Sequence, residues 1–308
     1  MNRRHRRGFS LVELVTVLGI ISILITLLLP AVQSSRENAR RLQCEKNLMQ
    51  LGIALANYSS THEVLPPGVV NAKGPISNLP VGYHMSWVVQ ILPFLEERNI
   101  YNHVDFSQGA YAAANMSAFF PRIQVFMCPS DVRNDNMHYM GCHHDAEAPI
   151  DADNHGVLFL NSRIAYDDIG DGLAYTIVLG EARQSTTLGW ASGTRATLRN
   201  AGHALSDAEL TLPAWSGRSA NAVPIPPDMG DEFQEDEGNP LADFVTVLVQ
   251  NGTLPMYYVG GFSSNHIQGL NFLFCDGSTR FVKRTTNPDI LRRLANRDDG
   301  LVISDDEF

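Results

Sequence analysis

The stretch that decides the fold is residues 3–33, which read RRHRRGFSLVELVTVLGIISILITLLLPAVQ. Four arginines precede Gly8, and an apolar run of 21 residues extends from Phe9 to Leu29 with Glu13 as its one charged side chain. About 20 apolar residues in a helix are enough to cross the hydrocarbon core of a bilayer. A carboxylate in that position costs about 2.5–3.5 kcal/mol on insertion scales, so it indicates a functional partner. We therefore predict one membrane-spanning helix whose basic end stays in the cytoplasm.

Two simpler interpretations of this stretch compete. A secretory signal peptide also joins a basic head to an apolar run. The length of the run, the presence of Glu13 and the lack of a small-x-small cleavage site after Leu29 argue against it. A plain signal anchor fits the arginines and the hydrophobicity, but it leaves Gly8-Phe9 and Glu13 without a reason.

The order of basic leader, Gly8, Phe9 and Glu13 resembles the type IV prepilin signal. This resemblance implies that a prepilin peptidase cuts after Gly8 and N-methylates Phe9, and that Glu13 is the acid needed for processing and assembly. The physical logic is charge pairing, because the new α-ammonium of one subunit neutralises Glu13 of its neighbour inside the bilayer. The expected partners are a prepilin peptidase/methylase, other pilin-like subunits and membrane lipid.

The anchor helix is expected to continue into the soluble region. Apolar residues recur at spacings of three and four, the pattern of a helix with one buried face; they are Leu48, Leu51, Leu55 and Tyr58. Pro66-Pro67-Gly68 should end the helix. We therefore expect a leader (1–8), a transmembrane half-helix (9–30), a soluble half-helix (31–60) and an extracytoplasmic domain (61–308).

The soluble domain is predicted to be α+β, with the pilin-like helix packed on a mainly antiparallel sheet and with long loops. A short helix interrupted near Pro93 is expected within Trp87–Tyr101. Asp276-Gly277 indicates a hairpin turn, and residues 217–240 read as an acidic, proline-rich loop. Strands are expected at Ile123–Met127, Val157–Leu160, Thr176–Gly180, Tyr257–Gly260, Leu270–Phe274 and Thr279–Val282.

A second motif joins His266, nine intervening residues and Asp276-Gly277. With segments 86–102, 125–131 and 167–181, it resembles a large bacterial family that has a prepilin-type N-terminus and is grouped with pilin-like and secretion-pseudopilin proteins. A catalytic interpretation would pair His266 with Asp276 as base and orienting acid. We favour a structural one, in which Asp276 bonds turn amides and His266 packs near the start of a strand.

Four cysteines, Cys44, Cys128, Cys142 and Cys275, would lie outside the cytoplasm, where disulfides persist. Three pairings are open, and free thiols are an alternative. We expect Cys44–Cys128, which would tie the helix to the Cys-Pro-Ser-Asp segment, and Cys142–Cys275, because Cys275 replaces the usual small residue of the family.

Metal binding has two candidate segments. Thiolate and imidazole in Cys142-His143-His144-Asp145 suit zinc or copper, but the spacing matches no established zinc motif and adjacent histidines do not readily face one ion. We expect a polar surface loop there, or a loop that organises a strand edge. Calcium would suit the acidic stretch 167–172, although Asx-turns explain that stretch as well. The resemblance to secretion pseudopilins, some of which bind calcium in a C-terminal loop, makes Asp276 with loop carbonyls a second, less favoured candidate, because the chain lacks an EF-hand spacing. No cofactor is expected.

Charge limits the choice of partners. The chain carries 33 acidic and 23 basic side chains, a net charge of −10, and loss of the leader arginines would make it −14. Nucleic-acid binding relies on cationic contacts to phosphates, so it is not expected.

The sequence therefore predicts a non-enzymatic pilin or pseudopilin subunit, single-pass in the inner membrane with its acidic domain outside, for a type IV pilus-like filament or a type II secretion pseudopilus. The alternative is a membrane-anchored binding protein that recognises a ligand through loops 131–155 or 228–240. An exported hydrolase would rest only on scattered His and Asp residues.

Overall fold

The computed structural model describes residues 11–131, 137–183, 188–205, 256–266, 268–301 and 303–304. Gly8, Phe9 and the predicted loop 217–240 lie outside these residues.

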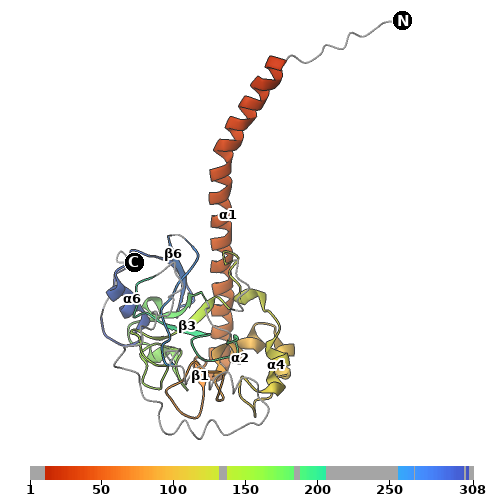
Figure 1. Ribbon diagram of the computed structural model, residues 1–308. Coiled ribbons are helices and arrows are strands. Elements are labelled where there is room, and N and C mark those ends of the chain that lie inside the picture. The colour runs from red at the N-terminus through yellow and green to blue at the C-terminus, as the bar shows by residue number, and fades with distance from the viewer. Residues whose placement is uncertain are drawn as a thin grey trace, which may run out of the picture.

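One helix dominates the molecule. Helix α1 runs from Leu11 to His62, 52 residues, and its N-terminal part projects from the folded head as a rod (Figure 1). The rod bends partway along, and α1 contains Pro30. A proline inside a helix removes one backbone hydrogen bond and is the usual cause of such a bend. The helix ends at His62, shortly before the Pro-Pro-Gly sequence, as predicted.

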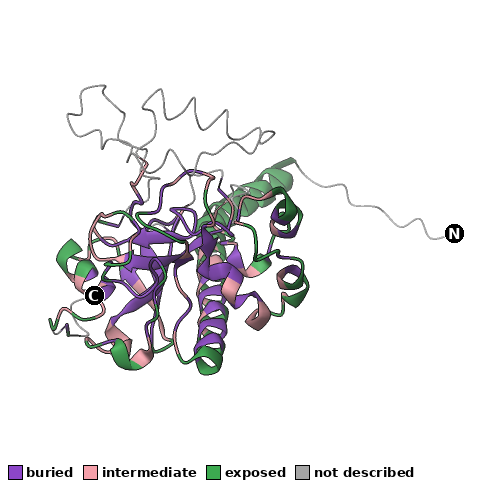
Figure 2. Ribbon diagram, turned by 90° about the horizontal axis from the view of Figure 1, so that it is seen from below, coloured by how far each residue is buried: buried purple, intermediate pink, exposed green. Residues whose placement is uncertain are grey.

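The two halves of α1 have opposite environments. Large apolar side chains from Leu11 to Leu29 are exposed, whereas Leu48, Leu51 and Leu55 are at most 2% exposed. Figure 2 shows this buried stripe facing the sheet. The predicted amphipathic face is thus a face of the core.

The core sheet has five strands in the order β5-β3-β4-β6-β7. All neighbours are antiparallel except β3 and β5. The strands are β3 (Tyr139–His144), β4 (Ile177–Glu181), β5 (Leu198–Asn200), β6 (Gly269–Phe274) and β7 (Thr279–Lys283). The expected α+β class with a mainly antiparallel sheet is confirmed.

Helices cover both faces of this sheet. The Tyr139 hydroxyl meets Asn47 of α1, while the Cys142 sulfur meets the Ala295 carbonyl at the end of helix α6 (Pro288–Ala295). Tyr139 and Cys142 have opposite parity in β3, and side chains alternate between faces of a strand. Helices α1 and α6 therefore lie on opposite sides of the sheet.

The remaining elements are short. Trp87–Tyr101 contains helix α2, a 3₁₀ turn with Pro93 and the start of helix α3, which agrees with the predicted interruption. The bounds are β1 (Val69–Val70), β2 (Met85–Ser86), α2 (Trp87–Ile91), η1 (Leu92–Phe94), α3 (Arg98–Asn102), α4 (Ala113–Phe119), η2 (Gln124–Phe126), η3 (Tyr166–Asp168) and η4 (Leu173–Tyr175).

Three of the predicted strands are wrong. Ile123–Met127 forms the 3₁₀ helix η2, because the Phe126 amide bonds back to Ile123. Val157–Leu160 begins in a bend, and its backbone hydrogen bonds go to Cys142 of β3 and Val69 of β1. Tyr257–Gly260 is a loop. Conversely, β3 runs through the polar loop that was expected at residues 142–145, and its first five residues are buried.

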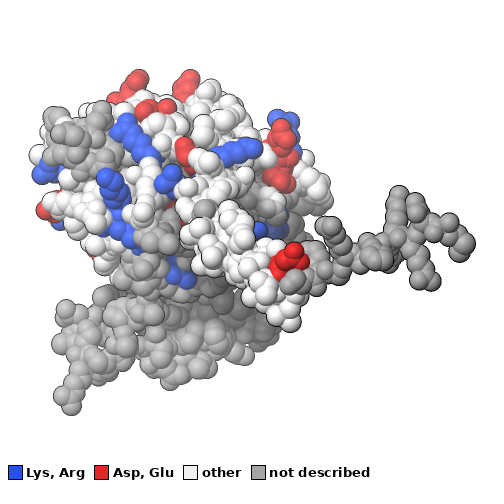
Figure 3. Space-filling model, turned by 90° about the horizontal axis from the view of Figure 1, so that it is seen from above, with Lys and Arg blue, Asp and Glu red and all other residues white. Residues whose placement is uncertain are grey.

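Charges are mixed on the described surface. Figure 3 shows acidic and basic side chains interspersed over one face of the head.

Candidate functional site

The apolar half of α1 carries Glu13 in its first turn, among exposed apolar neighbours. Hydroxyl groups along this half donate to carbonyls one turn back: Thr16 to Val12 at 3.0 Å and Ser22 to Leu18 at 2.8 Å. A helix in lipid must satisfy its polar groups internally, and these hydroxyl groups do so. The helix is long and apolar enough to cross a membrane by length and composition. The roles of Gly8, Phe9 and Glu13 remain predictions.

The most organised polar site lies where α1 meets the head. His266 is buried between two carboxylates from distant parts of the chain. Its Nδ1 lies 2.7 Å from Glu37 Oε1 on α1, and its Nε2 lies 3.4 Å from Glu181 Oε1 at the end of β4. The side chains of His266 and Glu181 are each 3% exposed, and that of Glu37 is 29% exposed. The imidazole therefore links the stem helix to the central strand.

Several hydrogen bonds fix this arrangement. Asn271 of β6 donates its amide Nδ2–H to Glu181 at 2.8 Å and its backbone N–H at 3.2 Å. Arg284 donates to the carbonyls of Ser264 and His266, each at 2.7 Å. The Glu181 carboxylate and the backbone of the loop before β6 are thus both held in place by hydrogen bonds.

The electrostatics favour a charged imidazole. Burial alone would lower the pKa of His266, but the hydrogen bonds and negative charges of Glu181 and Glu37 outweigh it and raise that pKa. Burial would raise the pKa of Glu37, but His266 and Arg40 together lower it. Arg40 lies 2.6 Å from Glu37. The result is a carboxylate–imidazolium–carboxylate chain whose charges compensate one another.

A hollow of about 420 Å³ opens beside this chain of charges, between α1 and the start of the sheet. Glu37, Arg40, His266 and Phe281 are among its lining residues. His266 is thus reached from the surface on the side that faces α1.

The Asp276-Gly277 half of the motif lies at the other end of β6. Asp276 accepts a hydrogen bond from the Ser278 amide at 2.8 Å, and Gly277 has a φ of +84°, a region that favours glycine. The predicted hairpin turn is present, and His266 is separated from Asp276 by the whole strand. The structural interpretation of the motif is the one that the geometry supports.

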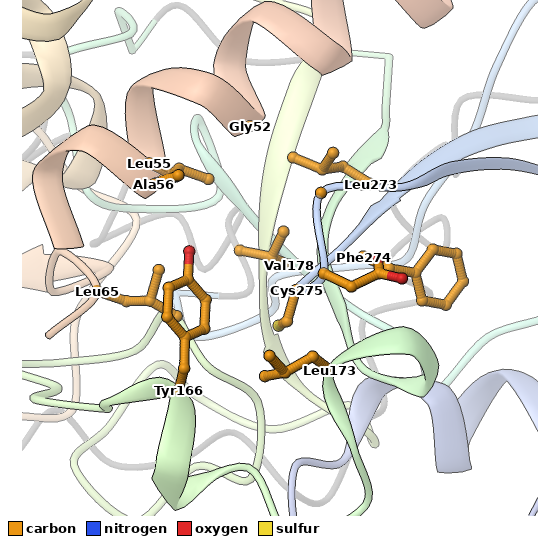
Figure 4. A pocket seen from close by; sticks show the side chains of 12 residues that line it. Gly52, Leu55, Ala56, Leu65, Tyr166, Leu173, Val178, Leu273, Phe274 and Cys275 are labelled. Carbon is orange, nitrogen blue, oxygen red and sulfur yellow. The ribbon is translucent and has the colours of Figure 1, made fainter. Parts of the chain in front are cut away.

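Beside that turn is an apolar hollow of about 260 Å³ under the C-terminal half of α1. Figure 4 shows Leu55, Tyr166, Leu173 and Cys275 around it. Most of the lining side chains are apolar, and the carboxylate of Asp276 is already hydrogen-bonded within the turn.

The cysteines divide into one bonded pair and two thiols. Cys44 of α1 and Cys128 form a disulfide, as expected, with Cα atoms 5.4 Å apart. The predicted Cys142–Cys275 bond is wrong, because both are buried free thiols. Strand β4 lies between β3 and β6, so these two segments are about 9–10 Å apart, beyond the reach of a disulfide.

The candidate metal segment 142–145 is split by strand alternation. Cys142 and His143 are fully buried on opposite faces, and His143 Nδ1 bonds Asn154 at 2.9 Å. His144 and His155 instead both bond Asp145 Oδ1, and hydrogen bonds from these histidines lower the pKa of Asp145 against the opposing effect of burial. The four predicted residues therefore do not converge on one point.

The acidic stretch 167–172 uses its carboxylates on backbone amides. Asp171 accepts from the amides of Asp299 and Gly300 at 2.8 Å, and Asp168 accepts from Ala165 at 2.8 Å. These hydrogen bonds stabilise turns and loops. They support the interpretation of this stretch as Asx-turns, which the sequence offered as the alternative to a calcium site.

Sequence reasoning missed Glu37 and Glu181 as partners of His266. Glu181 closes the segment 167–181 that contributed to the family resemblance, so a signal existed for it. Glu37 had none, because an acid on an exposed helix face is common and its partner is 229 positions away.

Comparison with known proteins supplies the family. Residues 3–29 match the family described as "Prokaryotic N-terminal methylation motif", and residues 33–289 match the one described as "Protein of unknown function (DUF1559)". The chain is 39% identical over 62 residues to competence protein ComGC of Halalkalibacterium halodurans, an alignment that covers 20% of this chain and 61% of ComGC. No solved structure matches the chain. The second family match spans most of the chain, from the soluble part of α1 to α6, and the chain therefore belongs to the family described as "Protein of unknown function (DUF1559)".

Proposed function

We propose that this protein is a pilin-like structural subunit that is processed at its N-terminus and assembled through α1. Processing would cut after Gly8 and methylate Phe9, and Glu13 would serve both steps. The product would be a type IV pilus-like filament or a type II secretion pseudopilus.

One observation carries the proposal: a methylation motif sits directly on a helix that is apolar and exposed at one end and built into the core at the other. A rod that leaves the head in this way offers its apolar surface to lipid and to neighbouring rods. The similarity to competence protein ComGC, over 62 residues, supports the same proposal.

The proposed location is the inner membrane, with the N-terminus cytoplasmic before cleavage and the head periplasmic or extracellular. The proposed partners are the prepilin peptidase and other pilin-like subunits. We propose no catalytic role, since the buried His266 is engaged by two carboxylates that orient and neutralise it.

The first test is mass spectrometry of the N-terminal peptide from the native membrane. A terminus at Phe9 with one added methyl group is the expected result. An uncut leader would favour the anchored binding protein, and a terminus beyond Leu29 would mean a secretory signal.

The second test separates assembly from anchoring. Glu13→Gln removes the charge with little change in size, and Thr16→Val, one turn along the same helix, is the matched control. We expect Glu13→Gln to lose methylation or incorporation into filaments and Thr16→Val to keep both. Normal assembly of both variants would contradict the proposal.

A further inference from the structure

Four buried side chains with metal-binding atoms meet at the junction of α1 and the head. They are Cys44, Cys128, Glu181 and His266, and their ligand atoms all lie within 4.8 Å of one another. We propose that these four residues, called here the four-ligand group, bind one Zn²⁺ ion when the Cys44–Cys128 bond is reduced. The site would then have two alternative cross-links, a disulfide and a metal.

The spacing of the ligand atoms fits a tetrahedral ion. Zinc bonds of about 2.0–2.3 Å place neighbouring ligand atoms roughly 3.3–3.8 Å apart. His266 Nε2 is 3.4 Å from Glu181 Oε1 and 3.8 Å from Cys128 Sγ. Both pairs already have the spacing of a zinc site, and binding also requires the two bonded sulfurs to separate.

The surroundings supply the orientation that such a site needs. A histidine ligand usually gives its second ring nitrogen to a carboxylate, and His266 Nδ1 faces Glu37 at 2.7 Å while Nε2 points into the group. Glu181 is in turn held by two hydrogen bonds from Asn271. Both ligands are therefore fixed before any ion arrives.

The donor set selects the ion. Two thiolates, one imidazole and one carboxylate give four ligands of the kinds that bind Zn²⁺ in closed structural sites. All four residues are buried, which also favours a structural site over a catalytic one with an open position. Three of them come from outside α1, so the ion would join the stem to the segment after η2, to β4 and to the loop before β6.

The chemistry balances with a dithiol as reductant. It transfers two electrons and two protons to the sulfurs of Cys44 and Cys128 and becomes a disulfide itself. Binding of Zn²⁺ then releases the two thiol protons, and a proton from His266 Nε2 if it carries one. The 420 Å³ hollow lined by Glu37 and His266 brings solvent to the neighbouring side of the group.

The test uses the metal-free full chain in detergent, in its oxidised and in its reduced form. Co²⁺ serves as the spectroscopic probe, and Zn²⁺ is added as its competitor. A phosphine serves as reductant; water supplies the oxygen of the phosphine oxide and the two protons. We expect one Co²⁺ per reduced chain, with thiolate charge-transfer and tetrahedral bands that Zn²⁺ abolishes. The oxidised chain should show neither band.

Two cysteine variants locate the site. Cys44→Ala/Cys128→Ala should lose these bands, whereas Cys142→Ala/Cys275→Ala, which removes the other two thiols, should keep them. A reduced, folded wild-type chain without the bands, or their loss in the Cys142→Ala/Cys275→Ala variant while that variant remains folded, would overturn the proposal.

Two further measurements cover the remaining cases. Glu37→Gln should weaken Co²⁺ binding by roughly 10–100-fold without changing the type of spectrum, because it orients His266 without touching the ion. If reduction unfolds the chain, Zn²⁺ should restore the native circular dichroism, and failure to do so would overturn the proposal.

Discussion

Replacing His266 by alanine should markedly lower the stability of the head. The side chains of His266 and Glu181 are each 3% exposed, so the variant would leave the Glu181 carboxylate buried with only the hydrogen bonds of Asn271. Breaking a buried ion pair from one side costs about 3–5 kcal/mol. The Glu37 contact adds little, because that side chain is 29% exposed and keeps Arg40. We expect a loss of about 3–4 kcal/mol in unfolding free energy.

The assay is denaturant unfolding of the oxidised full chain in detergent, followed by tryptophan fluorescence. Trp87 and Trp190 are almost fully buried and will report loss of the core. The matched control is His155→Ala, whose imidazole also pairs with a carboxylate, 3.0 Å from Asp145, but is 52% exposed. Exposed pairs contribute about 0–1 kcal/mol, so this variant should stay near wild type.

A double-mutant cycle identifies the cause. His266→Ala/Glu181→Gln removes the stranded charge, so its cost should be clearly less than the sum of the two single variants. A loss below about 1 kcal/mol for His266→Ala, or additive losses in the cycle, would refute the argument that His266 compensates the charge of Glu181.

Three further predictions concern other parts of the head. Burial lowers the pKa of His84 to about 4, below its unfolded value of about 6.5, so at pH values between these two only the unfolded chain binds the proton. The contribution of His84 to the unfolding free energy should therefore fall by about 2–3 kcal/mol from pH 7 to pH 4.5, in addition to the loss from the similarly buried His143. In denaturant titrations at the two pH values, His84→Asn should reduce the total loss by the part that His84 contributes. Leu48 is a fully buried residue of α1, and Leu48→Ala should lower the unfolding free energy by about 2–5 kcal/mol in the same assay. Its neighbour Met49 is 48% exposed, so Met49→Ala should change the unfolding free energy by less than about 0.5 kcal/mol. Equal losses would mean that this helix face is not part of the core. Gly68→Ala would press the new Cβ into the backbone of a neighbouring segment and should lower the unfolding free energy by about 1–3 kcal/mol. A Cβ added at Gly189 would have no other atom within 4 Å, so Gly189→Ala should leave stability unchanged. Thermal melts of the two variants test this difference.

Local patterns were enough to predict the parts of the fold that depend on neighbours in sequence. The long helix follows from its apolar run and its stripe at spacings of three and four, and the β6–β7 hairpin follows from Asp276-Gly277. Strand β3 was missed because Cys142-His143-His144-Asp145 looks polar. In the folded head His143 is buried, and burial, assisted by nearby positive charge, lowers its pKa to about 4 despite its hydrogen bond to Asn154, so a neutral histidine is part of the interior.

The site at His266 depends on distant contacts, and these were not predictable from one sequence. Glu37, Glu181 and His266 come from the stem, the centre of the sheet and a loop near the C-terminus. Each has an ordinary local context. The wrong Cys142–Cys275 pairing has the same origin, because it required the strand order, in which β4 separates the two segments.

The position of the Cys44–Cys128 bond along α1 has a mechanical consequence. Cys44 precedes Leu48, Leu51 and Leu55, so it lies nearer to the projecting end than most of the buried stripe. Tension applied to the projecting end reaches this covalent bond before it reaches the apolar contacts. With the bond intact, the load passes through the two sulfurs into the segment that carries Cys128, and the buried stripe is shielded from it. Without the bond, the stripe itself carries the load. Whether a pull on the stem strains the contact between α1 and the sheet therefore depends on the state of two sulfur atoms.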